Sequence, residues 1–201
     1  MIIESGFDQG TDEWFKARCG NPGASEISNI VTSTGKISTS RENFMWRMAE
    51  ESFSGENPKA FKTYYTERGH KLEPKARNWF AYKNKCQVQE CAMIYPDSKR
   101  WHVSPDGIIP DLEEGLEIKC PSLKVHDQYL QKGVCPTEYR IQVQSSLAVT
   151  GWKTWWFVSY FPEVTPLIIP VKRDEKLIAI ILKEMDRFIT DLDALIERLK
   201  A

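Results

Sequence analysis

The sequence predicts one α+β domain in which helices flank a mixed central β-sheet. The chain of 201 residues contains no repeat, low-complexity tract or linker-like segment, so we expect a single domain over residues 1–201. Short alternating runs bounded by turn residues fill the middle of the chain, and two aromatic or β-branched runs follow them. Segments in which apolar residues recur at helical spacing lie before, between and after these runs.

The expected helices follow from apolar spacing and end signals. They cover residues 10–18, 41–53, 68–80, 136–150 and 174–200. Thr11 or Asp12 caps the first helix. The helix around residues 68–80 contains Pro74, and a proline fits a helix only in its first turn. This helix is therefore expected to start near Glu73 or to be kinked there.

The expected strands are short. They cover residues 87–95, 99–104, 116–120, 154–160 and 167–172. Consecutive short strands are most simply joined as an antiparallel meander, and we expect one over residues 87–120.

Composition excludes several classes of protein. The 41% hydrophobic content is enough for a core, and the net charge of −1 argues against a uniformly basic nucleic-acid coat but not against a local basic groove. The five cysteines form no Cys-x-x-Cys pair, so we expect a reducing environment rather than a disulfide framework or a zinc site. The chain starts without a signal-like segment and has no run long enough to span a membrane, so we expect an intracellular protein.

The stretch from Ser104 to Pro121 carries the strongest chemical signal. Asp106 lies in a Pro-Asp-Gly turn, and residues 116–120 read as a strand in which Glu117 and Lys119 project from the same face. A hairpin would bring Asp106 beside them. Two carboxylates can hold Mg²⁺, and the lysine can orient or deprotonate a water or neutralise charge on a phosphoryl group. This combination is typical of metal-assisted phosphodiester hydrolysis.

The same stretch has an ordinary interpretation. Pro-Asp-Gly is a common turn, and Glu-x-Lys is a common exposed strand edge. The apolar residues that alternate with Glu117 and Lys119 favour a buried site instead. A helix over 136–150 carries further polar candidates, Gln142 and Gln144, which lie on different faces.

An anion site is a second candidate. Ser25 lies near the start of a helical segment after the loop over residues 20–24, and Arg18 lies just upstream. Ser25 acting only as a helix cap, with Arg18 solvated, is the simpler interpretation of these residues alone. Likewise, Glu73 and Arg77 have the spacing of an ordinary ion pair within a helix.

Together these segments resemble a known family. The chain resembles the lambda-type alkaline exonucleases, the YqaJ group of viral recombinases in the PD-(D/E)xK nuclease superfamily. The resemblance covers most of the chain up to about residue 162, and its motifs occur in the family's order. They are residues 14–18, 24–27, Gly69 to Ala76 with Glu73 between them, 104–107, 116–121, and 139–144.

The resemblance implies a restriction-endonuclease-like core and a 5′→3′ exonuclease that digests linear double-stranded DNA and leaves 3′ single-stranded overhangs. It also implies a ring-shaped homotrimer around DNA, an accompanying single-strand annealing protein, and phage or prophage origin with activity in the cytoplasm of a bacterial host. Basic residues that could line the ring's channel are Lys36, Arg41, Lys62, Arg68, Lys71 and Lys124.

The resemblance also assigns roles to individual residues. Asp106, Glu117 and the main-chain carbonyl of Ile118 would bind Mg²⁺, and Glu73 would support a second ion or the water. Mn²⁺ would be able to substitute. Lys119 would activate the water, and Gln142 would order the site. A further pair, Arg18 and Ser25, would hold the terminal 5′-phosphate.

Three alternatives stay open at this point. A structure-selective endonuclease on the same fold would cut DNA that has no free ends. A DNA-binding module without catalysis would have no use for buried, costly carboxylates, so the full Asp106, Glu117 and Lys119 set speaks against it. If the motif is coincidental, the chain is a plain α+β binding protein and Asp106→Ala would leave every DNA-related property unchanged.

Overall fold

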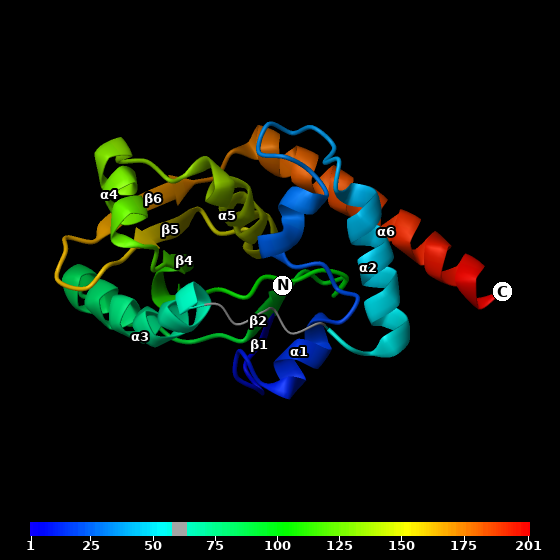
Figure 1. Cartoon of the computed structure of the whole chain (residues 1–201), viewed down its shortest axis with the longest axis horizontal. Helices are drawn as coiled ribbons and strands as arrows, with labels where there is room; N and C mark the ends of the chain where they lie inside the picture. The colour runs from blue at the N-terminus through cyan, green and yellow to red at the C-terminus, as the bar shows by residue number, and fades with distance from the viewer. Residues whose placement is uncertain (58–63) are drawn as a thin grey trace.

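A four-stranded sheet forms the centre of the computed structural model, which describes residues 1–57 and 64–201, with side chains in the second range described from Glu67 onward. The strand order is β3, β4, β5, β6, and their bounds are Gly107–Ile109, Glu114–Lys119, Thr154–Ser159 and Leu167–Lys172. β4 and β5 are parallel, whereas the two outer pairings are antiparallel. The predicted mixed sheet is confirmed (Figure 1).

The hairpin predicted around the central motif is present. β3 and β4 pair antiparallel with Gly107 opposite Leu116, so Asp106 directly precedes the paired region. The N–H of Asp106 donates to the carbonyl of Leu116 at 3.1 Å, which extends the ladder by one bond. A short 3₁₀ segment, Pro110–Leu112, and the left-handed residue Glu113 form the connection between the strands.

The predicted meander over residues 87–120 is only partly right. Its β2 strand, Met93–Tyr95, pairs with β1, Ile2–Glu4, in a separate two-stranded sheet. Isolated bridges join Gln89 to Ile108 and Ile94 to Val103, so the segment touches the hairpin without becoming a strand of the central sheet. The N-terminal strand supplies the backbone partner for β2 that the prediction had placed elsewhere.

Each predicted helix is present, and the described ranges contain one further α-helix that the sequence did not predict. The α-helices are α1 Asp12–Arg18, α2 Arg41–Ser54, α3 Tyr64–Asn84, α4 Leu123–Lys132, α5 Thr137–Thr150 and α6 Glu175–Lys200, with a 3₁₀ segment, η1, at Ala24–Asn29. Side chains of Thr11, Ser122 and Asp174 accept hydrogen bonds from the first turns of α1, α4 and α6. The unpredicted helix is α4, which ends at left-handed Gly133.

Pro74 lies inside α3, and the helix neither starts nor stops there. Proline removes one N–H from the helix ladder and costs about 3 kcal/mol in a helix interior. Its exposed position allows the ring to face solvent, while the neighbouring Ala76 and Phe80 are fully buried against the sheet. Packing of this face offsets the lost hydrogen bond.

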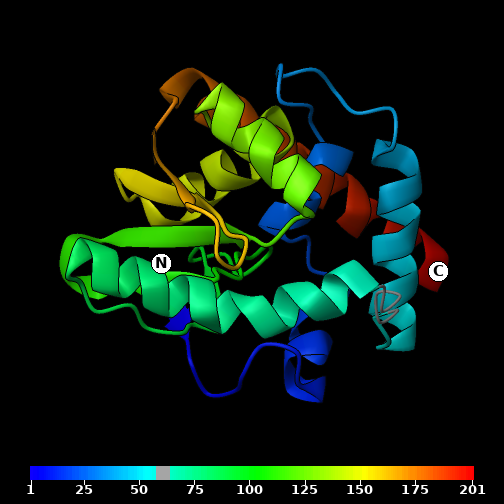
Figure 2. The ribbon, with the colours of Figure 1, turned by 60° about the vertical axis from the view of Figure 1, so that its left-hand side comes forward.

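Helices cover both faces of the sheet. α3 packs on one face through an apolar cluster formed by Ala76, Phe80, Ile109, Leu116, Ile118 and Val158. On the other side, α5 packs against β5, and α6 and α2 extend the main core beyond it. Figure 2 shows α3 running across the front of the sheet, with α4 and α5 on its other side. The catalytic candidates of β4 therefore lie between α3 and α5.

Two further sequence expectations concern the chain's surroundings. No helix in the described ranges is long and apolar enough to cross a membrane. All five cysteines are free thiols.

Candidate active site

Successive side chains of β4 point alternately toward α3 and toward α5. Leu116 and Ile118 point into the apolar cluster under α3. Glu117 and Lys119 therefore project from the opposite face, toward α5. Gly115 lies on this same face, where a Cβ would come within 2.4 Å of the Trp155 ring. The small residue lets the buried tryptophan of β5 pack beside the acidic strand.

Glu117 is the centre of this site. Its side chain is 3% exposed, and the Lys119 ammonium lies 2.5 Å from its Oε1 atom. The Nε2 atom of Gln142, on α5, donates a hydrogen bond to Oε2 at 2.7 Å. Tyr139, one turn earlier on α5, places its ring 5.1 Å from the lysine Nζ atom. The structure thus brings together Glu117 and Lys119, which were expected on one strand face, and Gln142, which was expected on a neighbouring helix.

Asp106 is held beside this group by the main chain of β4. Its Oδ2 atom accepts a hydrogen bond from the N–H of Ile118 at 2.5 Å. Burial, and then the negative charge of Glu117, raise the pKa of Asp106 well above its usual range. Burial by itself lowers the pKa of Lys119, but the carboxylates of Glu117 and Asp106 more than reverse this and raise it. The lysine is therefore a cation facing two carboxyl groups.

Glu73 reaches the site from α3 and is tied to Arg77. The Nη2 atom of Arg77 donates to Glu73 Oε1 at 2.8 Å, which confirms the predicted ion pair within the helix. The same guanidinium donates from Nε to the main-chain carbonyl of Asp106 at 2.6 Å and pairs with Glu90. Burial raises the pKa of Glu73 against the opposing effect of Arg77. Sequence spacing identified the pair, but not the contact by which Arg77 fastens α3 to Asp106.

The donor set fits a hard divalent cation. Mg²⁺ is commonly held by one or two carboxylates while keeping several waters, and Asp106 and Glu117 supply two carboxylates. Their closeness is electrostatically costly without a cation, as the raised pKa of Asp106 indicates. Within the described residues, no group of three or more His, Cys, Asp or Glu side chains is arranged to hold a metal, so Glu73 does not complete a three-carboxylate cluster.

The second predicted site lies on α1 and η1. Arg18 is largely buried, lies over the Trp14 ring at 4.4 Å, and its Nη2 atom is 3.9 Å from Glu26 Oε2. Burial lowers the pKa of Arg18. Ser25 is exposed and does not cap η1, because Gly23 occupies the cap position and its N–H donates to Glu26. The cap interpretation of Ser25 is therefore wrong.

Glu26 links Arg18 to residues that the sequence did not single out. Arg47, on α2, donates to Glu26 Oε1 at 2.5 Å and to Glu51 Oε1 at 3.2 Å. Glu51 is 1% exposed and also accepts from the N–H of Gly20 at 3.2 Å. This network holds the loop after Arg18 against α2. The sequence signal that could have found this network is the i, i+4 spacing of Arg47 and Glu51.

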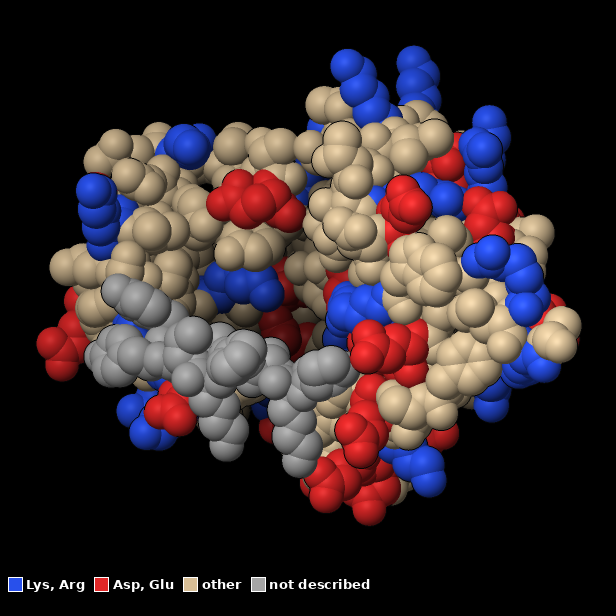
Figure 3. All heavy atoms as spheres, turned by 45° about the vertical axis from the view of Figure 1, so that its right-hand side comes forward, with Lys and Arg blue, Asp and Glu red and all other residues tan. Residues whose placement is uncertain are grey.

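Two of the candidate channel residues are already engaged. Arg41 pairs with Asp191 of α6 at 2.8 Å, and Arg68 donates to main-chain carbonyls near the end of β4. Lys62 lies outside the described residues. On the face drawn in Figure 3, Lys and Arg side chains are interspersed with Asp and Glu, and a central hollow has side chains of both signs around it. Among the described residues on this face, Lys and Arg form no continuous basic surface.

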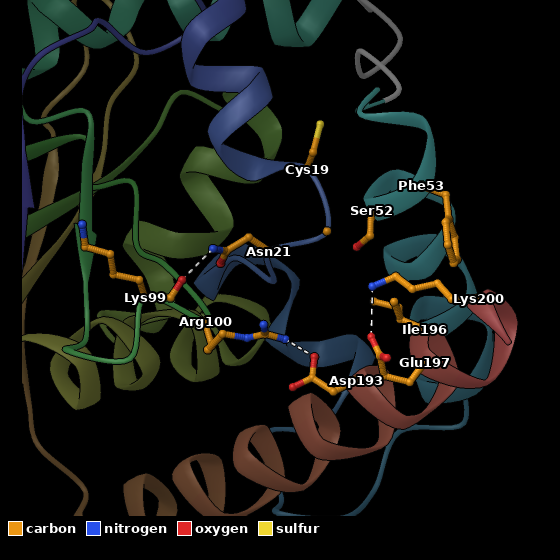
Figure 4. Close-up of a pocket in the computed structure, with 11 residues that line it drawn as sticks. Cys19, Asn21, Ser52, Phe53, Lys99, Arg100, Asp193, Ile196, Glu197 and Lys200 are labelled. Carbon is orange, nitrogen blue, oxygen red and sulfur yellow. Dashed lines mark hydrogen bonds and ion pairs between the residues drawn. The ribbon is translucent and has the colours of Figure 1, made fainter.

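A pocket of about 600 Å³ lies elsewhere, between the loop after α1 and the C-terminal ends of α2 and α6. Figure 4 shows an ion pair between Arg100 and Asp193 of α6 in its wall, and a second pair within α6 between Lys200 and Glu197. Its lining includes neither carboxylate of the β3–β4 hairpin. We place the chemistry at the hairpin, because carboxylates and a lysine converge there, rather than at this pocket.

The fold and the hairpin site define a nuclease of the PD-(D/E)xK type. A family model for the YqaJ-like viral recombinase domain matches residues 13–153, and the chain belongs to that family. The structure is similar to the crystal structure of an alkaline exonuclease, LHK-Exo, from Laribacter hongkongensis. The TM-score is 0.85 and the identity 32%, with 94% of this chain and 96% of that chain covered. The same protein in complex with dAMP matches with the same values.

A phage-related exonuclease from Haemophilus somnus 129PT shares the fold at a TM-score of 0.70 and 17% identity, covering 89% of this chain and 96% of that chain. Among curated proteins, none matches this chain significantly. The family and the alkaline exonuclease match together support a DNA exonuclease.

Proposed function

We propose that this protein is a Mg²⁺-dependent 5′→3′ exonuclease that digests linear double-stranded DNA and leaves 3′ single-stranded overhangs for annealing. The observation that carries the proposal is the convergence of Asp106, Glu117, Lys119 and Gln142 at the end of β4. Membership of the recombinase family and the similarity to an alkaline exonuclease give this site its substrate class.

In this proposal Asp106, Glu117 and the main-chain carbonyl of Ile118 hold Mg²⁺, with a second ion supported from Glu73 and Mn²⁺ able to substitute. Bound metal would lower the pKa of a coordinated water and stabilise charge on the leaving oxygen. The role of Gln142 is to keep the Glu117 carboxylate oriented through its 2.7 Å hydrogen bond. Glu73 has to share its carboxylate with Arg77, to which it is hydrogen-bonded.

Lys119 acts beside the attacking water. Its contact with Glu117 and its raised pKa keep it protonated in the metal-free protein. A protonated lysine donates hydrogen bonds but accepts none. We therefore assign it to activating the water by orienting it and to neutralising negative charge on the phosphoryl oxygens, rather than to removing the proton. The Tyr139 ring, 5.1 Å from Nζ, limits the directions open to the ammonium.

Arg18 and Ser25 are proposed to bind the terminal 5′-phosphate. Arg18 is held in place by the Trp14 ring and by Glu26, so little side-chain entropy remains to be lost on binding. Ser25 is exposed and directly precedes Glu26, so its hydroxyl is available as a second hydrogen-bond donor to the phosphate. Arginine suits a terminal phosphate because its planar guanidinium can donate two parallel hydrogen bonds.

The oligomeric state and the partner protein are inferred from the family and not from the residues of this chain alone. We propose a ring-shaped homotrimer around duplex DNA ends and a single-strand annealing protein as the functional partner. The setting would be the cytoplasm of a bacterial host carrying the phage or prophage. A ring would confine positive charge to its lumen, which is compatible with the net charge of −1.

The direction of digestion is tested with linear duplexes that carry nuclease-resistant phosphorothioate linkages at only their 5′ ends or only their 3′ ends. The proposal predicts that 5′ protection stops digestion, whereas 3′ protection leaves the rate unchanged. The reverse pattern would contradict the 5′→3′ direction while leaving the exonuclease assignment intact.

The terminal-phosphate site is tested with the same duplex carrying a 5′-phosphate or a 5′-hydroxyl. The phosphorylated form should be digested faster, and Arg18→Ala should remove that preference. Lys16→Ala, which removes an exposed cation from the same helix, is the matched control and should retain it. Equal rates on the two substrates with the unmutated protein would remove Arg18 and Ser25 from this role.

A further inference from the structure

Arg68 makes an unusual set of contacts close to the catalytic strand. It lies on α3, near the first turn of described side chains. Its Nη1 atom donates to two consecutive main-chain carbonyls, those of Cys120 at 2.8 Å and Pro121 at 2.7 Å. The guanidinium also lies over the ring of Phe161, with its Cζ atom 4.7 Å from the ring centroid.

These contacts fall where the chain leaves the central sheet. β4 ends at Lys119, so the carbonyls of Cys120 and Pro121 lie beyond its strand ladder. The N–H of Tyr160 donates to the carbonyl of Lys119 at 2.9 Å and links the ends of β5 and β4. Arg68 continues this link, since it binds the two carbonyls after Lys119 and covers the residue after Tyr160.

We propose that Arg68 is a positioning residue for Lys119. It holds the turn by which β4 ends, and so keeps the backbone of Lys119 where the ammonium meets both Glu117 and the reacting phosphate. The inference rests on the proposed nuclease function and adds a residue to its machinery. Displacement of a catalytic group by about 1 Å can cost about 10²-fold in rate, so a single anchor at the strand end is significant.

The contacts argue against the channel role that the sequence allowed for Arg68. One terminal nitrogen is occupied by two carbonyls. The other, Nη2, is buried and has no hydrogen-bond partner in the described part of the chain. A guanidinium placed in this way is turned toward the protein's main chain rather than toward a DNA phosphate in solvent. Its removal should therefore affect catalysis more than DNA binding.

Arginine is required here for its shape. The planar guanidinium stacks on an aromatic ring while its in-plane N–H groups reach the carbonyls, whereas a lysine ammonium is a compact point charge without a stacking plane. We therefore expect Arg68→Lys to lose most of the contribution that Arg68 makes to positioning Lys119. Arg68→Met keeps an unbranched apolar stem for packing near Phe161 but no donor, so it serves as the variant of choice if Arg68→Ala does not fold.

The test is a kinetic and chemical-rescue experiment on the full-length protein. Arg68→Ala should lower kcat on linear duplex about 10–100-fold, the range seen when a group that orients a catalytic ligand is removed. KM should change less than about twofold, because phosphate contacts in solvent are intact. Guanidinium chloride, well below denaturing concentration, should restore part of kcat by occupying the vacated position. Sodium chloride at the same ionic strength should not.

Lys75→Ala is the control, since it removes an exposed cation from the same helix, and its kcat should stay at the wild-type value with no response to guanidinium. A wild-type protein that digests no DNA would refute the proposed function itself. With an active wild type, an unchanged kcat in Arg68→Ala would overturn the positioning role. So would a rise in KM alone, or a loss of kcat that follows a drop in Tm and does not respond to guanidinium.

Discussion

Replacing Asp106 with asparagine should stabilise the metal-free protein while abolishing its activity. The wild-type carboxylate is partly buried beside Glu117, and burial and then the charge of Glu117 raise its pKa. Like charges 4–6 Å apart repel by about 3–4 kcal/mol at an effective dielectric constant of 20. Attraction to Lys119 offsets much of this repulsion while partial burial adds a desolvation cost, and we expect a net cost of about 1–2 kcal/mol. An asparagine oxygen can still accept the hydrogen bond from the N–H of Ile118.

The pH dependence of this effect has a definite sign. A carboxyl group whose pKa is raised on folding destabilises the folded state, and this cost grows as the pH rises from the unfolded-state pKa toward the raised pKa of Asp106. Below the ordinary aspartate pKa of about 3.9 the carboxyl is protonated in both states, and the advantage of Asp106→Asn disappears. Above the raised pKa of Asp106 the advantage is complete and no longer changes with pH.

The measurement is urea unfolding followed by tryptophan fluorescence in EDTA, with Asp111→Asn as a control because Asp111 is an exposed carboxylate of the same hairpin connection. Asp106→Asn should gain about 1–2 kcal/mol, or roughly 2–8 °C in Tm for a chain of this size. Mg²⁺ at about 100 times its Kd should stabilise the wild type by about 2.7 kcal/mol and leave Asp106→Asn unaffected. A destabilised Asp106→Asn protein, or one that Mg²⁺ stabilises equally, would refute this reasoning.

Three further perturbations test neighbouring parts of the structure. Gln142→Ala removes the donor to Glu117 and should lower kcat about 10–100-fold at nearly unchanged Tm; an unchanged kcat would contradict its ordering role. Burial, and then a nearby arginine charge, hold the pKa of His102 well below its usual range, so stability is full above about pH 6.5 and is lost as the pH falls below it. His102→Gln should therefore reduce the fall in Tm between about pH 7.5 and about pH 5, and an equal fall would count against this assignment. Gly115→Ala places a Cβ 2.4 Å from the Trp155 ring and should cost about 1–3 kcal/mol in urea unfolding; a neutral result would show that the ring can move aside.

The parts of the site that depend on local geometry could be predicted from the sequence. Two-residue alternation places Glu117 and Lys119 on one strand face, and the structure confirms that they are in contact. The short connection after the Pro-Asp-Gly turn predicts the hairpin that brings Asp106 back to β4. Gln142 follows from its helix and from the family's motif order, and it donates to Glu117 as that position implies.

The parts that depend on distant segments could not be predicted. Pairing of β1 with β2 joins residues about 90 positions apart, and neither strand carries a signal that identifies its partner. The contacts of Arg68 and Arg77 with main-chain carbonyls arise only after α3 has packed across the sheet. Pro74 shows the same limit, since its local preference is overridden by burial of the helix face beside it.

The missed helix α4 has a different cause. Ser122 and Gly133 are a recognisable cap and stop signal, but only His126 and Tyr129 of this helix are buried. The segment is short and buries few side chains, although its apolar residues do gather on one face of the helix. Signals at the helix ends were therefore the better guide here.

The most direct test of the central claim is digestion of linear and covalently closed circular duplex DNA by wild-type protein and Lys119→Ala, each with Mg²⁺ and with EDTA. We predict loss of linear DNA alone, only with Mg²⁺ and only with the wild-type protein. Cutting of the circle would indicate an endonuclease on the same fold. No cutting of either substrate by folded, Mg²⁺-supplied wild-type protein would contradict the nuclease assignment and favour a DNA-binding module.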